Sequence, residues 1–227
     1  MRFKKLHSWE VTPSDAVEIQ KRLRSQVKIE PFDWSKARTV AGVDISYNRF
    51  SPTFYAAFVV LDARSMEIID NGTAVVDVSF PYIPGLLSFR EIPALIQAWE
   101  ALATDPDVIL VDGHGIAHPR RLGIASHLGL VLDKPTIGCG KSILAGTHAP
   151  LADVAGAHAP LVHRGERVGE VLRLKRGSNP VIVSPGHRTD LQSALTVVRA
   201  CARGYKLPEP TRQAHLFVNH LRIEKSA

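Results

Sequence analysis

The spacing of hydrophobic residues divides this 227-residue chain into two kinds of segment. Residues 39–47, 54–61 and 67–78 are rich in β-branched and aromatic residues and are linked by short polar turns, with Asn71-Gly72 as a further turn inside the third run. Such a series predicts an antiparallel meander of strands. Before it, a rough apolar stripe behind Ser14 or Asp15 predicts a helix that extends to about residue 28.

After residue 86 the pattern alternates between helical and strand periods. Helices are expected at 86–103, 122–132, 191–203 and 211–223, with Pro93 kinking or restarting the first of them. Strands are expected at 107–112, 135–139, 168–175 and 181–184. Residues 146–166, rich in Gly, Ala, His and Pro, are expected to form a surface loop.

A meander followed by β-α units predicts an α/β fold. The expected architecture is a ribonuclease H-like mixed sheet flanked by helices. We expect one domain over residues 1–227, because α/β folds of this length are commonly undivided.

Asp112 stands at a position that favours phosphodiester chemistry. It follows the apolar run 108–111 and precedes Gly113, with Arg120 and Arg121 a few residues further on. An acid at the carboxyl end of a strand can be a metal ligand, and a glycine next to it leaves room for a substrate. Paired arginines supply positive charge for a phosphate group. This combination indicates a metal-dependent nuclease site.

Two more acids occupy compatible positions. Asp44 lies between Val43 and Ile45 in the first strand run, and Glu91 lies early in the helix after the meander. A carboxylate among apolar strand residues is costly to bury unless it is paired or bound to a cation. For a lone acid, strand alternation would favour a side chain that faces solvent, but three acids together favour the cation.

Carboxylates without cysteine partners favour hard cations, Mg²⁺ or Mn²⁺, over zinc. Such cations hold an attacking water and stabilise the leaving oxygen in phosphodiester hydrolysis. Lys141 is a candidate to neutralise the scissile phosphate or orient the nucleophile, although a solvated lysine would give the same signal. His187, just past the last strand run, is a candidate to face the same cleft, and its alternative is a surface position.

Residue identities at key positions argue against two other kinds of site, a phosphate loop and a zinc protease motif. Gly140-Lys141-Ser142 would need a glycine five residues before Gly140 to form a phosphate loop, and that position is Pro135. His114 and His118 have the spacing of a zinc protease motif, but no glutamate follows His114.

Amino-acid composition limits the class of binding partner and the cellular compartment that we expect. Lys and Arg number 28 against 22 acids, a net charge of +6, which is compatible with a polyanionic partner. Two cysteines are too few for a disulfide framework or a four-thiolate zinc site, so a reducing, cytoplasmic setting is expected. The sequence has no signal-peptide pattern and no 18-residue apolar run, so no membrane partner is expected.

The segment Pro81-Tyr82-Ile83-Pro84 is a candidate for contact with bases. Two prolines stiffen a protruding loop and hold Tyr82 and Ile83 outward, as a side chain that enters a base step requires. By composition alone, a turn whose tyrosine packs on the core is the favoured alternative.

At several long motifs the chain resembles the endonuclease V family, the deoxyinosine-directed repair nucleases. The resemblance runs through 40–44, 80–91, 112–127, 135–138, Lys141, 185–187 and 208–212, in the order of the family. One departure is Cys139-Gly140 before Lys141, where the family is expected to have Val-Ala; the glycine adds flexibility next to the lysine.

The resemblance implies a ribonuclease H-like fold and hydrolysis of the second phosphodiester bond on the 3′ side of deoxyinosine in DNA, leaving the base in place. Mg²⁺ is the implied cofactor, with Mn²⁺ as its substitute. Asp44, Glu91 and Asp112 are implied as metal ligands, Lys141 as a group at the phosphate and His187 as a residue that borders the site.

By the same resemblance, Pro81, Tyr82, Ile83 and Pro84 form a wedge that separates the strands. The flipped hypoxanthine is expected in a pocket whose glycines let the backbone approach the base edge closely. The residues of this pocket are Gly113, His118, Gly123, Ile124 and Gly138. Arg120 and Arg121 are expected at phosphates. A monomer is expected, and inosine-containing RNA is a second candidate substrate.

Two other functional classes compete with this interpretation. One is a ribonuclease H-like nuclease of different specificity, such as a junction-selective enzyme, and the other is a catalytically silent nucleic-acid-binding protein. The presence of all three acids disfavours the silent binder, and the wedge segment disfavours the generic nuclease.

Overall fold

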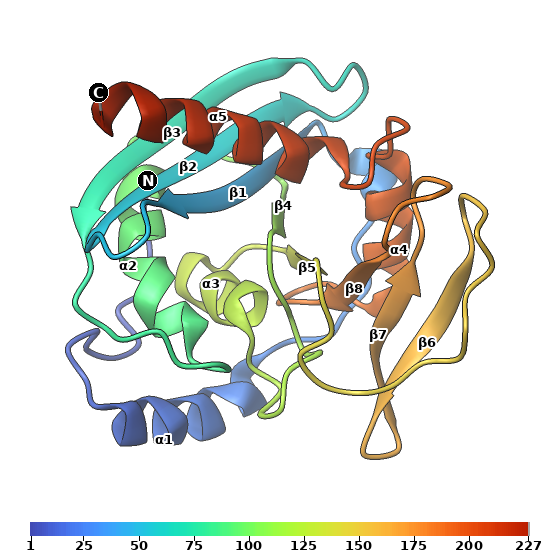
Figure 1. Ribbon diagram of the computed structural model, residues 1–227, viewed down its shortest axis with the longest axis horizontal. Coiled ribbons are helices and arrows are strands. Elements are labelled where there is room, and N and C mark those ends of the chain that lie inside the picture. The colour runs from blue at the N-terminus through green and yellow to red at the C-terminus, as the bar shows by residue number, and fades with distance from the viewer. Residues whose placement is uncertain (227) are drawn as a thin grey trace.

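Figure 1 shows the computed structural model, which describes residues 1–226. Eight strands form one sheet in the order β3-β2-β1-β4-β5-β8-β7-β6. Their bounds are β1 (Thr39–Tyr47), β2 (Thr53–Asp62), β3 (Ile68–Asp77), β4 (Val108–Val111), β5 (Thr136–Gly140), β6 (His158–His163), β7 (Glu166–Leu172) and β8 (Val181–Pro185).

The helices account for most of the remaining chain. Their bounds are α1 (Pro13–Leu23), α2 (Leu87–Glu100), α3 (Ile124–Leu132), α4 (Leu191–Ala200) and α5 (Glu209–Ser226), with short 3₁₀ turns η1 (Arg24–Gln26) and η2 (Trp34–Lys36). None of the helices among the described residues is long and apolar enough to span a membrane.

Strand pairing confirms the expected meander and the mixed, ribonuclease H-like sheet. β1, β2 and β3 pair antiparallel in sequence order, whereas β4 pairs parallel to both β1 and β5. β8 then pairs antiparallel to β5 and continues into the β6–β7 hairpin. The carboxyl ends of β1 and β4 therefore meet at the same edge of the sheet.

Helices cover both faces of the sheet, and alternate strand residues divide between two cores. On one face, Ala41 and Val43 of β1 pack in the core that contains α2 and α3. On the other face, Val40 packs in the core that contains α4 and residues of α5. Figure 1 shows α5 running along β1 and β2 on the side opposite α2 and α3. β1 is therefore enclosed by helices on both of its faces.

Three local predictions are wrong, each for a physical reason. Asn71-Gly72 does not form a turn, because β3 is continuous; a Cβ on Gly72 would stand 2.2 Å from the carbonyl oxygen of Ala98, so this glycine allows α2 to approach the strand closely. The expected loop 146–166 contains the whole of β6, an edge strand of alternating exposure that includes Pro160. The first helix begins at Pro13, capped by Thr12 and not by Ser14 or Asp15.

Candidate active site at the carboxyl ends of β1 and β4

Two of the predicted metal ligands lie side by side where the parallel pairing of β1 with β4 ends. The parallel strands pair Val43 with Val111, so Asp44 and Asp112 are the next residues along each chain. Their side chains are only 11% and 15% exposed. Asp44 does not face solvent, so the solvent-facing alternative for this acid is wrong.

Alternation along β1 explains where Asp44 points. Val43 packs on the side of α2 and α3, so Gly42 and Asp44 face the other side, where α5 lies. A Cβ on Gly42 would stand 1.9 Å from the carbonyl oxygen of Pro210. The backbone of α5 therefore rests directly on β1, and the next residue on this face meets a helix instead of water.

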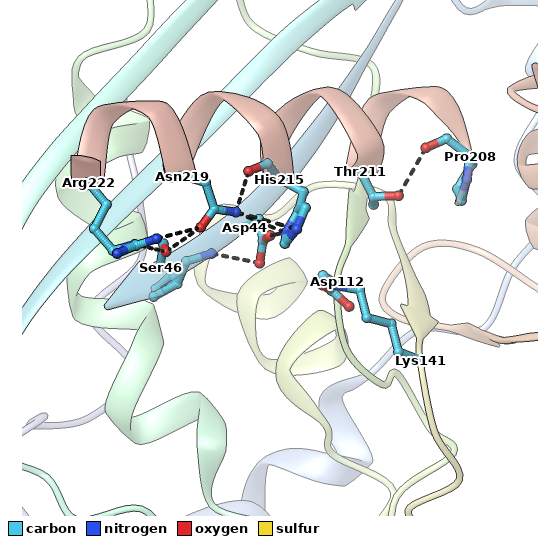
Figure 2. A network of polar contacts seen from close by, with 10 residues as sticks. Asp44, Ser46, Asp112, Lys141, Pro208, Thr211, His215, Asn219 and Arg222 are labelled. Carbon is cyan, nitrogen blue, oxygen red and sulfur yellow. Dashed lines mark hydrogen bonds and ion pairs between the residues drawn. The ribbon is translucent and has the colours of Figure 1, made fainter. Parts of the chain in front are cut away.

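His215 of α5 is the group that Asp44 meets. Its Nδ1 lies 2.7 Å from Oδ2 of Asp44. Figure 2 shows His215, Asn219 and Arg222 along one side of α5, with Ser46 beyond Asp44 on the strand below them. The hydrogen bond that the ring donates to Asp44 raises the pKa of His215, although burial opposes the shift.

Lys141 follows β5 and forms an ion pair with Asp112. Burial raises the pKa of Asp112 and the charge of Asp44 raises it further, while Lys141 opposes both effects. Burial alone would lower the pKa of Lys141, but the charge and the hydrogen bond of Asp112 raise it. The ammonium group therefore stays charged among the carboxylates.

Glu91 completes the acidic cluster from the first half of α2. It stands one turn after Ser88, near the beginning of the helix. Burial, followed by the charges of Asp44 and Asp112, raises the pKa of Glu91 to about 8. Because both aspartates act on this carboxyl group, the structure brings the three predicted acids together at one place.

The donors in this cluster fit a hard divalent cation. Three closely spaced and partly buried carboxylates are unfavourable unless a positive charge lies beside them. Their oxygen donors suit Mg²⁺ or Mn²⁺. As arranged in the structure, however, no group of three or more His, Cys, Asp or Glu side chains among residues 1–226 could hold a metal ion. Lys141 and His215 instead hold Asp112 and Asp44. A cation bound here would take over part of the role of these two side chains.

A cavity opens beside the acidic cluster, and the predicted wedge lies along its wall. Tyr82, Ile83 and Pro84 line it. Tyr82 is 64% exposed, so the alternative in which this tyrosine packs on the core is wrong. The residues expected in the base pocket that also line the cavity are Gly113, His118, Gly123 and Ile124.

Gly138 supports this cavity from behind instead of lining it. A Cβ on Gly138 would stand 2.5 Å from the backbone nitrogen of Gly115 and 2.7 Å from the carbonyl oxygen of Gly113. A Cβ on Gly123 would stand 2.2 Å from the carbonyl oxygen of His114. The glycines therefore allow three backbone segments to pack against one another beneath the cavity.

Arg120 and Arg121, expected at phosphates, are both bound to protein groups. The guanidinium of Arg120 donates to Gln20 and to the carbonyl oxygen of Gly85, at 2.5 and 2.8 Å. That of Arg121 pairs with Glu166 at 2.8 Å. A phosphate group would have to compete with these contacts. The two positive charges in the sequence therefore did not show that both arginines are bonded within the protein.

His187 lies away from the acidic cluster, with its side chain 3% exposed. Its Nδ1 accepts the backbone N–H of Lys28 at 3.2 Å, and its Nε2 lies 3.5 Å from Asp133. Burial, partly offset by Asp133, lowers its pKa. The structure therefore places this histidine among residues next to α1 and α3 and not against Asp44 or Asp112.

Two residues at the site were missed from the sequence. His215 gave no signal, because only the packing of α5 on β1 brings it to Asp44 across 171 positions. Gln20 lines the cavity with its side chain buried. A polar residue on the otherwise apolar stripe of a short helix was a weak indication that this glutamine is bonded inside the protein.

Sequence comparison and structure comparison both relate this chain to the same family of known proteins. The family model for endonuclease V matches residues 21–216. The endonuclease V of Myxococcus xanthus is 50% identical over 214 residues, which cover 94% of this chain and 91% of that protein.

Two solved structures are similar over nearly the whole chain. The crystal structure of endonuclease V from Streptomyces avermitilis has a TM-score of 0.90 and 40% identity, and the match covers 97% of each chain. That of Ciona intestinalis endonuclease V, in complex with a 24-mer DNA containing an inosine followed by a ribo-adenosine, has a TM-score of 0.79 and 26% identity. This match covers 94% of the present chain and 98% of the other.

Proposed function

Because the chain belongs to the endonuclease V family, we propose that it is a metal-dependent endonuclease that acts on DNA containing deoxyinosine. The cut falls at the second phosphodiester bond on the 3′ side of the altered base, which stays in the strand. The observation that carries this proposal is the cluster of Asp44, Glu91 and Asp112 directly beside a cavity walled by the exposed Tyr82 loop.

The acids have the role of cation ligands. Asp44, Glu91 and Asp112 hold Mg²⁺, and Mn²⁺ replaces it. The bound cation supplies Lewis acidity at the scissile phosphate and lowers the pKa of water. A pKa of about 8 for Glu91 supports this role, because such a carboxyl group is stabilised as a carboxylate only when positive charge stands beside it.

Two cationic or hydrogen-bonding side chains serve the same centre. Lys141, which pairs with Asp112, offers its ammonium group to the phosphate oxygens that gain charge during cleavage. His215 holds Asp44 through Nδ1 and so fixes the orientation of that carboxylate. Neither side chain needs to change its protonation state for these roles.

The cavity has the role of a pocket for the flipped base. Lining glycines let backbone groups approach a base edge, and Tyr82 replaces the stacking that the base leaves behind. The inosine-containing DNA bound by the Ciona protein, which shares the fold, supports this substrate class.

Adjacent residues of one segment connect the pocket to the reaction centre. Asp112 belongs to the acidic cluster, and Gly113, the next residue, lines the cavity. A base held at Gly113 places a nearby phosphate of the same strand at Asp112. This arrangement supports a cut in the backbone a short distance from the lesion.

A cleavage assay tests the proposal. End-labelled oligonucleotides that carry a single deoxyinosine, as duplex and as single strands, are incubated with the protein with and without Mg²⁺, and matched adenine oligonucleotides are the control. We expect one product that ends at the second 3′ bond, only with inosine and only with metal. Equal cutting of adenine oligonucleotides would instead support a nuclease of different specificity.

An RNA oligonucleotide with a single inosine is the second arm of that assay. The Ciona complex contains a ribo-adenosine after the inosine, which is the specific observation that makes inosine in RNA a candidate substrate. Faster cleavage of the RNA than of the matched DNA would assign RNA as the preferred substrate of the same site.

A further inference from the structure

One carbonyl oxygen at the base of the wedge loop accepts hydrogen bonds from three side chains. The carbonyl of Gly85 accepts from Nε2 of Gln20 at 3.0 Å, from Nε2 of His118 at 2.9 Å and from Nη2 of Arg120 at 2.8 Å. Gly85 has φ of +82°, a conformation that favours glycine, and it follows Pro84 directly. We call these three side chains the Gly85 clamp.

Both ring nitrogens of His118 are used within the clamp. Nδ1 accepts the backbone N–H of Arg120 at 3.1 Å, so the ring proton lies on Nε2, which donates to Gly85. Burial lowers the pKa of His118 to about 4, which keeps the ring neutral. No nitrogen of this ring is left to bond to a base, although the residue lines the cavity.

Gln20 is the residue that joins the parts of the clamp. Its side chain is 1% exposed, and its amide nitrogen donates both to Gly85 and, at 3.2 Å, to the carbonyl oxygen of Leu122 in the cavity wall. Its Oε1 accepts Nε of Arg120 at 2.5 Å. One buried amide from α1 therefore ties the wedge loop, the cavity wall and Arg120 to one another.

The other end of the loop is held in a similar way. Nη1 of Arg90 donates to the carbonyl oxygen of Phe80 at 2.9 Å, and its guanidinium lies 4.8 Å from the centre of the Phe54 ring. The four loop residues 81–84 thus stand between two carbonyl groups that side chains hold in place. A loop fixed at both ends loses little conformational entropy when it meets a nucleic acid.

From these contacts we propose that Gln20 and Arg120 are positioning residues that hold the wedge loop over the cavity and so determine how well inosine is distinguished from adenine in duplex DNA. This inference rests on the proposed function. It assigns Arg120 to the loop and not to phosphate, and it gives α1, whose Gln20 precedes the matched family stretch at residue 21, a part in recognition.

The first test follows the loop itself and needs no substrate. In Gln20→Leu, the side chain stays buried but both donors and the acceptor are lost, while the control Gln192→Leu changes an exposed glutamine on α4. Amide hydrogen exchange is measured by mass spectrometry on the whole protein. We expect exchange in residues 80–87 to become roughly ten-fold faster in Gln20→Leu only, with β4 unchanged.

The second test measures cleavage of the same variants. We expect the ratio of kcat/KM for duplex inosine DNA to kcat/KM for matched adenine DNA to fall roughly ten-fold in Gln20→Leu, through a higher KM for the inosine duplex. The kcat and the cleavage of single-stranded inosine DNA should change less than about two-fold. A purely structural defect would lower kcat on both substrates and would lower the melting temperature to match.

Arg120→Lys separates the clamp from a phosphate contact and serves if Gln20→Leu folds poorly. Lysine keeps the charge but cannot donate from two planar nitrogens to Gln20 and Gly85 at once. A positioning role predicts the same loss of inosine discrimination as in Gln20→Leu, with the salt dependence of DNA affinity unchanged. A phosphate role predicts near-normal discrimination in Arg120→Lys. Arg199→Lys, an exposed change on α4, is the control.

Unchanged exchange in residues 80–87 would overturn the proposal, even if discrimination fell, because Gln20 would then act on the base directly. Faster exchange throughout the protein would also overturn it. A wild-type protein that does not cut inosine substrates overturns the proposed function, and the exchange experiment still decides whether the clamp holds the loop.

Discussion

Nδ1 of His215 lies 2.7 Å from Oδ2 of Asp44, which joins α5 to the strand that carries the first acid of the cluster. The pair closes one side of the reaction centre, because α5 lies on β1 where Gly42 has no side chain. Oδ1, the other oxygen of Asp44, accepts the backbone N–H of Ile45 at 2.8 Å, so both oxygens of this carboxylate are held in place.

Removal of this contact should slow cleavage without abolishing substrate binding. In His215→Ala, Asp44 loses a hydrogen bond to a charged group, worth about 1.5–3 kcal/mol, which corresponds to a roughly 10- to 100-fold lower kcat. Inosine DNA affinity in Ca²⁺ should change less than about two-fold. His220→Ala, on an exposed position of the same helix, is the control. A normal kcat in His215→Ala would show that the contact serves only the packing of α5.

Neutral replacements of the aspartates should abolish cleavage and keep the fold. Asp44→Asn and Asp112→Asn each remove an anionic ligand at nearly constant size, so lesion binding in Ca²⁺ should persist while product formation in Mg²⁺ disappears. Gel-shift and cleavage assays on the same preparations measure both. Substantial cleavage by either variant would remove that residue from the ligand set.

Glu91→Gln should behave in the same way and should also stabilise the protein in the absence of metal. The carboxyl group is already disfavoured as an anion, since burial and two neighbouring acids raise its pKa to about 8. An amide has no charge to bury, so urea unfolding at pH 9 should show a more stable variant than wild type in EDTA. A mild cleavage defect would instead place Glu91 outside the direct ligands.

Tyr82→Ala should weaken recognition and leave the chemistry intact. In the proposed wedge the exposed ring would supply stacking on the order of 1–3 kcal/mol, so inosine discrimination should fall roughly 10- to 100-fold. The loss should be larger on duplex than on single-stranded DNA, where no partner strand must be held apart. Equal losses on both substrates would indicate that Tyr82 contacts the base in the cavity.

Acid should destabilise the protein through His127. This ring lies 2.8 Å from His7 and 3.0 Å from Ser88, and burial lowers its pKa to about 3, whereas it titrates near 6.5 when unfolded. Between these values the unfolded chain binds more protons, so the free energy of unfolding falls as pH drops below 6.5, by about 2 kcal/mol at pH 5.

Urea unfolding of wild type and His127→Gln at pH 7 and pH 5 measures this effect. Glutamine can still bond to Ser88 but does not titrate, so the variant should lose less stability on acidification. His220→Gln, at an exposed position, is the control and should behave like wild type. Equal losses in His127→Gln and wild type would assign the acid sensitivity to other groups.

Local pattern was enough to predict the meander and the places of the three acids. β1 and β2 alternate between two cores, so their spacing records which face each residue buries. Asp112 directly follows β4, and Asp44 directly follows the last residue of β1 that pairs with β4, so the parallel pairing brings the two acids to one place.

Contacts between distant segments were not predictable in this way. In the sequence, Arg120 is recognisable only as one of two adjacent positive charges, because it is the fold that brings Gln20 and Gly85 next to it. β6 was missed because an edge strand has one partner and needs little hydrophobic pattern, and Pro160 argued against it. In each case the missing information was which segment lies next to which.

The position of α5 along the chain also fixes an order of events during synthesis. A ribosome releases Asp44, Glu91 and Asp112 well before Glu209–Ser226, the helix that covers β1 and carries His215. Until then the β1 face that receives Pro210 is bare, and Asp44 has no partner from α5. The nascent chain can therefore bring its three acids together before α5 has been made, whereas the face of β1 that carries Asp44 is covered only after α5 has been translated.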